Sequence, residues 1–227
     1  MLTIVSQEDY MPDSNTKDQI IKSMLNTAFY KSAGETSLAN IAEGVNIKKA
    51  SIYNHFNSRE HLIEETCRSC KEYIEQISFI PSDIDSVSKK YPAETVLKGI
   101  VDRYFKMHEK QPLIQIYTFI QSQKYFTPEV MDIIQAQKTA LISQTEKVLL
   151  SLIQNEKINL DSNDVHSTAM WFCSAINDML SNYLLERKKD MLPFPEKNAD
   201  KMANAKSDDA AIEKINAYIE KFAELLK

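Results

Sequence analysis

The sequence has 227 residues, of which 43% are hydrophobic and 26% charged, and its formal net charge is −5. This length suits a small module joined to a larger one, and the composition is that of a water-soluble chain with a sizeable core. No run approaches the roughly 18 apolar residues of a membrane-spanning helix, and the net charge excludes a chain coated in positive charge but not one with a local basic patch.

The start of the chain and its cysteine content favour an intracellular protein. Residues 1–15 carry Glu8, Asp9 and Asp13, where a secretory signal would have a basic start and an apolar core. We therefore expect a flexible leader over residues 1–15. Three cysteines cannot all pair, which favours a reducing compartment, and we expect the cytoplasm.

The residue pattern up to about residue 80 predicts four helices. Glycine occurs only three times and strict apolar alternation is scarce, so the chain is predicted to be all-α. Thr16 followed by Gln19 has the spacing of a capping box, Thr36 or Ser37 can cap a second helix, and Ser58 can cap a long fourth helix. The expected helices cover about residues 17–32, 38–43, 48–56 and 59–80.

Prolines mark most of the helix starts in the rest of the chain, because proline is tolerated in the first turn of a helix. We expect a polar connection from Pro81 and then helices over about 92–110, 112–124 and 128–154. Asp161 or Ser162 should cap another long helix, Pro193 and Pro195 lie in a polar loop, and Ser207 or Asp208 should begin the last helix. The expected domains are residues 16–80 and 81–227.

The short connection between the second and third predicted helices is typical of a helix-turn-helix. Asn46 stands at the turn, and asparagine is one of the few non-glycine residues that tolerate a left-handed backbone. After the turn, lysine, hydroxyl and amide side chains point away from the face of Ile52 and Phe56. Such groups contact phosphates and base edges in DNA, and from Thr36 to Arg59 the basic residues outnumber the acidic ones.

Residues 36–65, "TSLANIAEGVNIKKASIYNHFNSREHLIEE", resemble the DNA-binding segment of the tetracycline-repressor (TetR) family of transcriptional regulators. The elements that match are Thr36-Ser37, Ile41-Ala42, Ser51-Ile52-Tyr53, His55-Phe56 and Ser58-Arg59-Glu60 with Leu62. The sequence departs from the family pattern at Asn46 and Ala50, where glycine is frequent, and in a first interhelical link that is about one residue short.

The resemblance implies an N-terminal three-helix DNA-binding domain, joined by a long fourth helix to a larger helical domain for ligand binding and dimerisation. It implies phosphate contacts from Thr36 and Ser37, DNA-backbone contacts from Lys49, Tyr53 and His55, and a basic anchor at Arg59. The implied base-reading candidates are Lys48, Ala50, Ser51 and Asn54. The alternative for this segment is a helical corner in a core, with Lys48 and Lys49 on a solvated face.

The larger domain carries apolar patterns that suggest a dimer and a ligand pocket. An apolar stripe follows Ile212, Ile215, Ile219, Phe222 and Leu226 in the last helix, and the preceding long helix is apolar around much of its circumference, so we expect a homodimer through the last two helices. Polar groups interrupt apolar faces in this domain, and an apolar or aromatic effector is favoured over a highly charged one. The candidate ligand-binding residues are Tyr104, His108, Tyr117, Gln121, Trp171 and Asn177, although each of them is also typical of a core or surface position.

Other chemistry has weaker support in the sequence. Cys67 and Cys70 form a CxxC pair that could sense redox state, but both fall on the apolar face of the fourth helix and suit small buried hydrophobes better. We expect no enzyme activity, metal or cofactor, because no phosphate-binding glycine loop, nucleophile elbow or HExxH motif occurs.

The preferred prediction is a ligand-responsive repressor that binds a near-palindromic operator; the alternative is a helical small-molecule-binding or adaptor protein without DNA binding.

Overall fold

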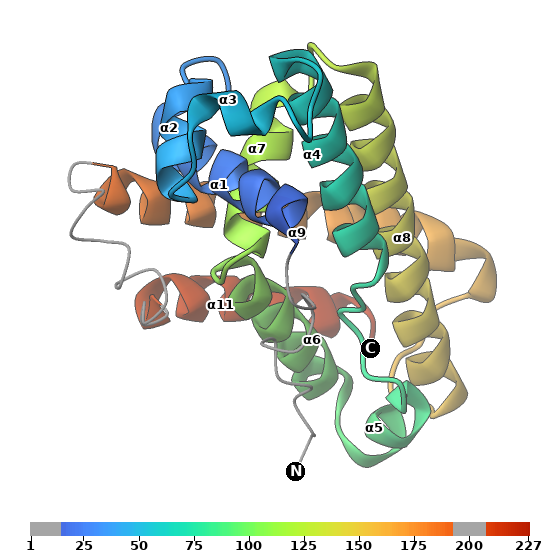
Figure 1. Cartoon of the computed structure of the whole chain (residues 1–227). Helices are drawn as coiled ribbons and strands as arrows, with labels where there is room; N and C mark the ends of the chain where they lie inside the picture. Colours follow the sequence, from blue (N-terminus) through green and yellow to red (C-terminus); the bar gives the residue numbers. More distant parts are fainter. Residues whose placement is uncertain (1–14, 193–207) are drawn as a thin grey trace. The chain divides into compact units, whose positions relative to one another are not determined.

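The computed structural model describes residues 15–192 and 208–227, and every regular element within them is a helix (Figure 1). The chain divides into two compact units, residues 1–71 and 72–227. No helix in the described ranges is long and apolar enough to cross a membrane. The two units are described separately below.

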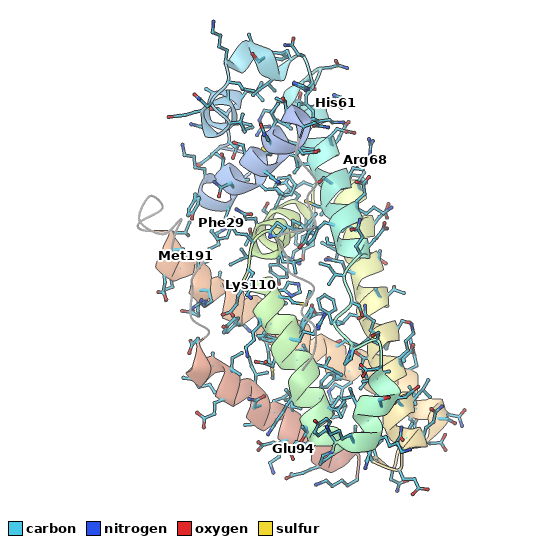
Figure 2. All side chains as sticks on the ribbon, turned by 60° about the horizontal axis from the view of Figure 1, so that its bottom comes forward. Phe29, His61, Arg68, Glu94, Lys110 and Met191 are labelled. Atoms are coloured by element: carbon cyan, nitrogen blue, oxygen red, sulfur yellow. The ribbon has the colours of Figure 1, made fainter. Side chains whose placement is uncertain are left out.

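The first unit holds three helices and most of a fourth, and together they bury one apolar core. These helices are α1 (Thr16–Lys31), α2 (Leu38–Gly44), α3 (Lys49–Ile52) and α4 (Arg59–Glu75), whose last turn belongs to the second unit. Figure 2 marks Phe29 on α1 and Arg68 on α4. The fully buried side chains include Ile20, Met24, Phe29, Ile41, Ile52, Phe56 and Leu62. Each of these segments therefore contributes apolar side chains to the core of the unit.

The starts of these helices are capped by short polar side chains. Asn15 accepts a hydrogen bond from the amide of Asp18 (3.1 Å), so the predicted cap at Thr16 is wrong by one residue. Ser37 caps α2 and forms a capping box with Asn40, and Ser58 accepts from the amide of His61 (3.1 Å) at the start of α4. Such caps satisfy amides that have no partner inside the helix.

The second unit is built from helices of very different lengths. They are α5 (Ile84–Lys90), α6 (Ala93–His108), α7 (Leu113–Gln123), α8 (Pro128–Gln154), the 3-10 turn η2 (Ser162–Asp164), α9 (Val165–Met191) and α11 (Asp209–Leu225). The predicted proline starts are confirmed for α6, α7 and α8, and Asp161 caps η2 just before α9. Asp208 caps α11 by accepting from the amide of Ala211 (3.1 Å).

The core of the second unit lies where α8 packs against α9 and α11 packs against α6. Leu149, Leu180, Ile219 and Phe105 are each completely buried there. At the start of α6, marked by Glu94 in Figure 2, Lys98 forms ion pairs with Glu94 and with Glu220 of α11. The apolar stripe predicted for the last helix is confirmed at Ile215, Ile219, Phe222 and Leu226, which are buried, while Ile212 is half-buried.

Three predicted helix lengths or connections also need correction. The third helix has only four helical residues, Lys49–Ile52, instead of the predicted 48–56. The fourth ends at Glu75 instead of near residue 80, and the expected polar connection from Pro81 contains α5. The predicted leader, apart from Asn15, the loop with Pro193 and Pro195, and a start at Ser207 lie outside the described residues.

Cys67 and Cys70 are both buried in α4, with exposed fractions of 2% and 0%. Burial, together with the neighbouring Cys67, raises the pKa of the Cys70 thiol. A thiol with a raised pKa stays protonated at neutral pH and is a poor nucleophile. The surroundings of Cys67 and Cys70 are therefore those of small buried apolar residues.

Candidate DNA-binding and ligand-binding sites

The turn between α2 and α3 redirects the chain over four residues, 45–48. Asn46 has φ 54°, so the predicted left-handed conformation at the joint is confirmed. The amide of Asn46 donates to the carbonyl of Glu43 (3.1 Å), and the amide of Ile47 donates to that of Ala42 (3.0 Å). These bonds satisfy the last carbonyls of α2 and fix the direction in which α3 leaves.

The segment from Lys48 to Phe56 has one buried face and one exposed face. Ile52 and Phe56 are 1% and 0% exposed, and after α3 the chain continues in turns, with the amide of His55 donating to the carbonyl of Ile52 (2.9 Å). Ser51 is half-buried. The exposed residues are Lys48, Lys49, Ala50, Tyr53, Asn54 and His55. Nearly all the candidates expected on this segment therefore share one accessible face.

The residues expected to bind DNA at the start of α2 differ in accessibility. Ser37 is exposed beside its capping partner Asn40. Thr36 is only 1% exposed, and its hydroxyl donates to the carbonyl of Ser32 (2.7 Å). The Thr36 side chain thus bonds within the module and is not presented to a phosphate.

Arg59 ties the loop between α1 and α2 to the start of α4. Its guanidinium donates to the carbonyl oxygens of Ala33, Gly34 (3.3 Å) and Thr36 (3.3 Å). Three carbonyl acceptors occupy most of the donors of this fork. The geometry therefore gives Arg59 a positioning role in the module, and its role as a basic anchor on DNA stays a prediction.

A cavity of about 380 Å³ lies within the second unit. Five of the six predicted ligand-binding residues line it: Tyr104, His108, Tyr117, Gln121 and Asn177. Ile74, in the last turn of α4, also lines it, as do apolar side chains that include Ile77, Leu113, Ile134 and Leu141. This volume is at the lower end of the range of small-molecule sites, roughly 300–1,000 Å³.

His108 is the most deeply buried ionisable group of the cavity wall, with 3% exposure. Its Nδ1 lies 2.8 Å from the carbonyl oxygen of Tyr104, and because a carbonyl can only accept, Nδ1 carries the proton. Burial lowers the pKa of His108 to about 4, against the smaller opposing effect of this hydrogen bond. The imidazole is therefore neutral at pH 7, and Nε2 is an acceptor.

Aromatic rings surround His108 and limit its movement. The ring of Phe79 stacks on the imidazole, with centroids 5.6 Å apart, and Tyr104 and Tyr117 meet it edge-on at 4.5 and 5.9 Å. The hydroxyl of Tyr104 donates to Oδ1 of Asn177 (2.9 Å), and burial raises the pKa of Tyr104. The wall is thus an aromatic cluster that holds a few fixed polar atoms.

Trp171, the sixth predicted ligand-binding residue, does not line this cavity. It is 56% exposed on α9 and meets the ring of Phe222 edge-on, with centroids 5.9 Å apart. The prediction missed Phe79 and Gln144, which do line the cavity. For Gln144 a signal was available, because Ile134, Gln137, Leu141 and Gln144 recur at helical spacing on the cavity side of α8.

The buried core, the tight turn and the exposed basic face of residues 48–55 define a helix-turn-helix module of the kind found in DNA-binding regulators. Residues 30–66 match the family described as bacterial regulatory proteins, tetR family. The predicted resemblance to the TetR family is confirmed by this match and by those that follow.

Known relatives match part of the sequence and solved structures match the fold. Over 95 residues the chain is 32% identical to the biofilm operon icaADBC HTH-type negative transcriptional regulator IcaR of Staphylococcus aureus (strain Newman). This match covers 40% of the chain and 51% of IcaR, so the chain spans about half the length of this curated relative.

Two solved structures share the all-helical fold over most of the chain. The TetR family transcriptional regulator PfmR from Thermus thermophilus has a TM-score of 0.53 and 14% identity, covering 90% of this chain and 97% of that one. AibR, in complex with isovaleryl coenzyme A and operator DNA, has a TM-score of 0.56 and 12% identity, with coverages of 89% and 96%. At these identities the likeness establishes the fold.

Proposed function

We propose that the protein is a ligand-responsive transcriptional regulator, a repressor that binds a near-palindromic operator as a homodimer. The observation that carries this proposal is the exposed face of residues 48–55 over the buried Ile52 and Phe56, inside a segment that matches the tetR family. The relative IcaR is a negative regulator, which supports repression over activation. We expect the protein to act in the cytoplasm, where operator DNA lies, and operator binding requires no catalytic step.

On the DNA, the exposed candidates and the half-buried Ser51 divide into two roles. Ser37, Lys49, Tyr53 and His55 supply donors for phosphate oxygens, which fix the register of the module without reading sequence. Lys48, Ala50, Ser51 and Asn54 are the candidates for base edges in the major groove. The methyl group of Ala50 can pack against a thymine methyl, and the amide of Asn54 suits adenine.

The dimer is proposed to form through α9 and α11. Trp171 and Leu185 are 56% and 64% exposed on α9, and Leu225 is 70% exposed on α11. Trp171 and Leu185 are separated by four helical turns and so lie on one side of α9. Exposed large apolar groups on one face are typical of a protein interface, and a second copy provides the same surface in return.

Analytical ultracentrifugation tests the dimer. Wild type should sediment as a dimer at micromolar concentration, and Leu185→Asp should shift it toward monomer. Glu186→Gln, at the exposed neighbouring position, serves as the control and should stay dimeric. A wild-type chain that sediments only as monomer at this concentration would contradict the interface.

Effector binding in the cavity is proposed to release DNA. AibR was solved with both an acyl-coenzyme A and operator DNA, which supports a small-molecule effector for this fold. A ligand shifts a two-state equilibrium only by its difference in affinity for the two states. Because Ile74 of α4 lines the cavity and α4 begins at Arg59 in the first unit, α4 is the covalent route from ligand to module.

Selection of DNA by the purified chain tests the proposed function. A random double-stranded pool should be enriched for sequences with two related half-sites, as expected for a symmetric dimer. Enrichment should require the module, so a Lys48→Glu, Lys49→Glu double variant should select nothing. If the wild-type chain enriches no sequence over the starting pool, the helical binding protein without DNA binding becomes the better description.

A further inference from the structure

The polar atoms of the cavity wall specify more about the effector than the cavity volume does. Nδ1 of His108 is bonded to the carbonyl of Tyr104, so a neutral ring offers a ligand one acceptor, Nε2. Both this bond and the bond between Tyr104 and Asn177 join uncharged groups. A hydroxyl or N–H donor is the natural complement of an acceptor such as Nε2.

Two amide side chains of the wall offer the opposite chemistry. Oδ1 of Asn177 accepts from the Tyr104 hydroxyl (2.9 Å), and Oε1 of Gln144 accepts from the backbone amide of Phe79 (2.8 Å). With their oxygens occupied, both side chains have NH₂ groups to offer. Each NH₂ group is a donor that suits a carbonyl oxygen.

The charged residues of the lining are more exposed than the histidine and aromatic side chains of the wall. Lys138 and Asp178 are exposed and Lys124 is half-buried, with its Nζ over the ring of Tyr125 (5.0 Å), which is itself 75% exposed. The deeper wall holds the buried side chains of His108, Tyr104 and Leu113. An anionic group placed against this deeper wall would lose its hydration without gaining a counter-charge.

We propose that the cavity binds an uncharged molecule with an apolar, ring-containing body, one hydroxyl group that donates to Nε2 of His108, and one carbonyl group that accepts from Asn177 or Gln144. The aromatic cluster of Phe79, Tyr104 and Tyr117 packs against the body of this ligand. The inference rests on the proposed function in so far as this molecule is the effector. It specifies the chemical class that the proposed function leaves open.

Calorimetric titration of the full chain with matched aryl ketones tests the assignment. The probes are 4-hydroxybenzophenone, 4-methoxybenzophenone and 4-benzoylbenzoate, together with the smaller 4-hydroxyacetophenone, 4-methoxyacetophenone and 4-acetylbenzoate, in slightly acidic buffer where the phenols keep their proton. The comparison is made within whichever series binds more tightly, the benzophenones or the acetophenones. There the hydroxyl compound should bind about ten-fold more tightly than the methoxy compound, because the methoxy compound cannot donate a hydrogen bond to His108. The carboxylate should bind more weakly than the hydroxyl compound.

Variants of the wall separate the two hydrogen bonds. His108→Phe should weaken the hydroxyl compound about ten-fold and leave the methoxy compound unchanged. Asn177→Asp and Gln144→Glu each keep an oxygen for the hydrogen bond that the side chain accepts but remove its NH₂ group, and one of these two variants should weaken both compounds. His166→Gln, at an exposed histidine of α9, is the control and should bind as wild type. If circular dichroism shows that His108→Phe does not fold, His108→Leu, which also lacks an acceptor, replaces it, and the two amide variants remain an independent test.

Three results would overturn the inference: equal affinity for hydroxyl and methoxy compounds, tighter binding of the carboxylates, or no binding by either hydroxyl compound. The selection of DNA described above is measured without these ligands, so the two proposals fail separately. A chain that enriches an operator but binds no hydroxyl compound keeps the proposed function and loses this inference. A chain that binds the hydroxyl compounds through His108 but enriches no DNA does the reverse.

Discussion

At the scale of single residues, the contact between α1 and α2 depends on the absence of a side chain at Gly44. A Cβ atom at this position would overlap the hydroxyl oxygen of Ser23, which is buried and held by a 2.9 Å hydrogen bond to the carbonyl of Ile41. We expect Gly44→Ala to destabilise the chain by about 1–3 kcal/mol, the range for an overpacked core. Urea unfolding followed by circular dichroism measures this difference.

Two further variants test whether overlap with Ser23 is the cause of the destabilisation by Gly44→Ala. At Gly99, inside α6, an added Cβ meets nothing within 4 Å. Gly99→Ala should therefore stabilise the chain by about 0.5–1 kcal/mol through helix propensity alone. Adding Ser23→Ala to Gly44→Ala removes the overlapping oxygen and should recover part of the loss. A Gly44→Ala chain as stable as the Gly99→Ala chain would show that the helices separate without penalty.

Asn46 is the second residue whose backbone restricts what can replace it. Its φ of 54° is left-handed, and a β-branched side chain is strained there. Asn46→Val should lower the free energy of unfolding by about 1–2 kcal/mol, whereas Asn46→Gly should stay closer to wild type. The matched control is Asn57→Val, an exposed loop position outside the residues with positive φ. If Asn46→Val and Asn57→Val lower the free energy of unfolding equally, the left-handed backbone at Asn46 is not the cause of the loss.

At the scale of elements, α3 and the turn that follows it carry two proposed DNA contacts of different kinds. Lys49 carries a charge that interacts with phosphate irrespective of sequence, so Lys49→Ala should weaken selected and random DNA by similar factors. It should reduce the slope of log affinity against log salt by about 1 for each protomer, or about 2 for the dimer. Asn54→Ala should instead weaken selected DNA and relax the preference at one position of each half-site, by about 1–3 kcal/mol. Fluorescence anisotropy with both DNAs at several salt concentrations separates these outcomes. Equal losses on both DNAs for Asn54→Ala would contradict its role as a base reader.

The helices that the sequence could predict are those with a long apolar stripe or a clear start signal. Proline and cap residues placed α6, α7 and α8 within a few residues. The short helix α5 was missed because two turns are too few to show a period, and its anchors come from elsewhere: the Ser151 hydroxyl of α8 donates to Asp85 (2.6 Å). The predicted length of α3 was too long because Phe56 has the spacing of a buried helical residue. In the structure Phe56 is buried, but it lies in the turn that follows the helix.

At the scale of the whole molecule, candidate site residues could be named from the sequence but not brought together. Tyr104 and Asn177 are 73 residues apart, and their hydrogen bond depends on how α6 and α9 pack. Phe79 lies beyond the end of α4, in a stretch that the sequence prediction assigned to the fourth helix, so nothing in its neighbourhood indicated that it would stack on His108. Trp171 has the residue type of a ligand contact, and only the packing of α9 shows that it lies outside the cavity.

The stability of the whole chain should depend on pH through His108. Its pKa is lowered by burial from 6.5 to about 4, so as the pH falls below 6.5 the unfolded chain binds this proton and the folded chain does not. Stability should therefore be complete above about pH 6.5 and fall as the pH drops toward 4, where the difference reaches roughly 3 kcal/mol. Urea unfolding at a series of pH values measures the slope.

The variant His108→Gln separates this proton from the others that titrate in acid. Carboxyl groups such as Glu65, whose pKa is lowered chiefly by its hydrogen bond with Lys17, lose their stabilisation only below about pH 4.5. Between pH 6.5 and 4.5, wild type should lose stability, and His108→Gln should lose less. If wild type and His108→Gln have the same slope in this window, the buried imidazole already takes up its proton in the folded chain. Nε2 could then no longer serve a hydroxyl ligand as an acceptor below neutral pH.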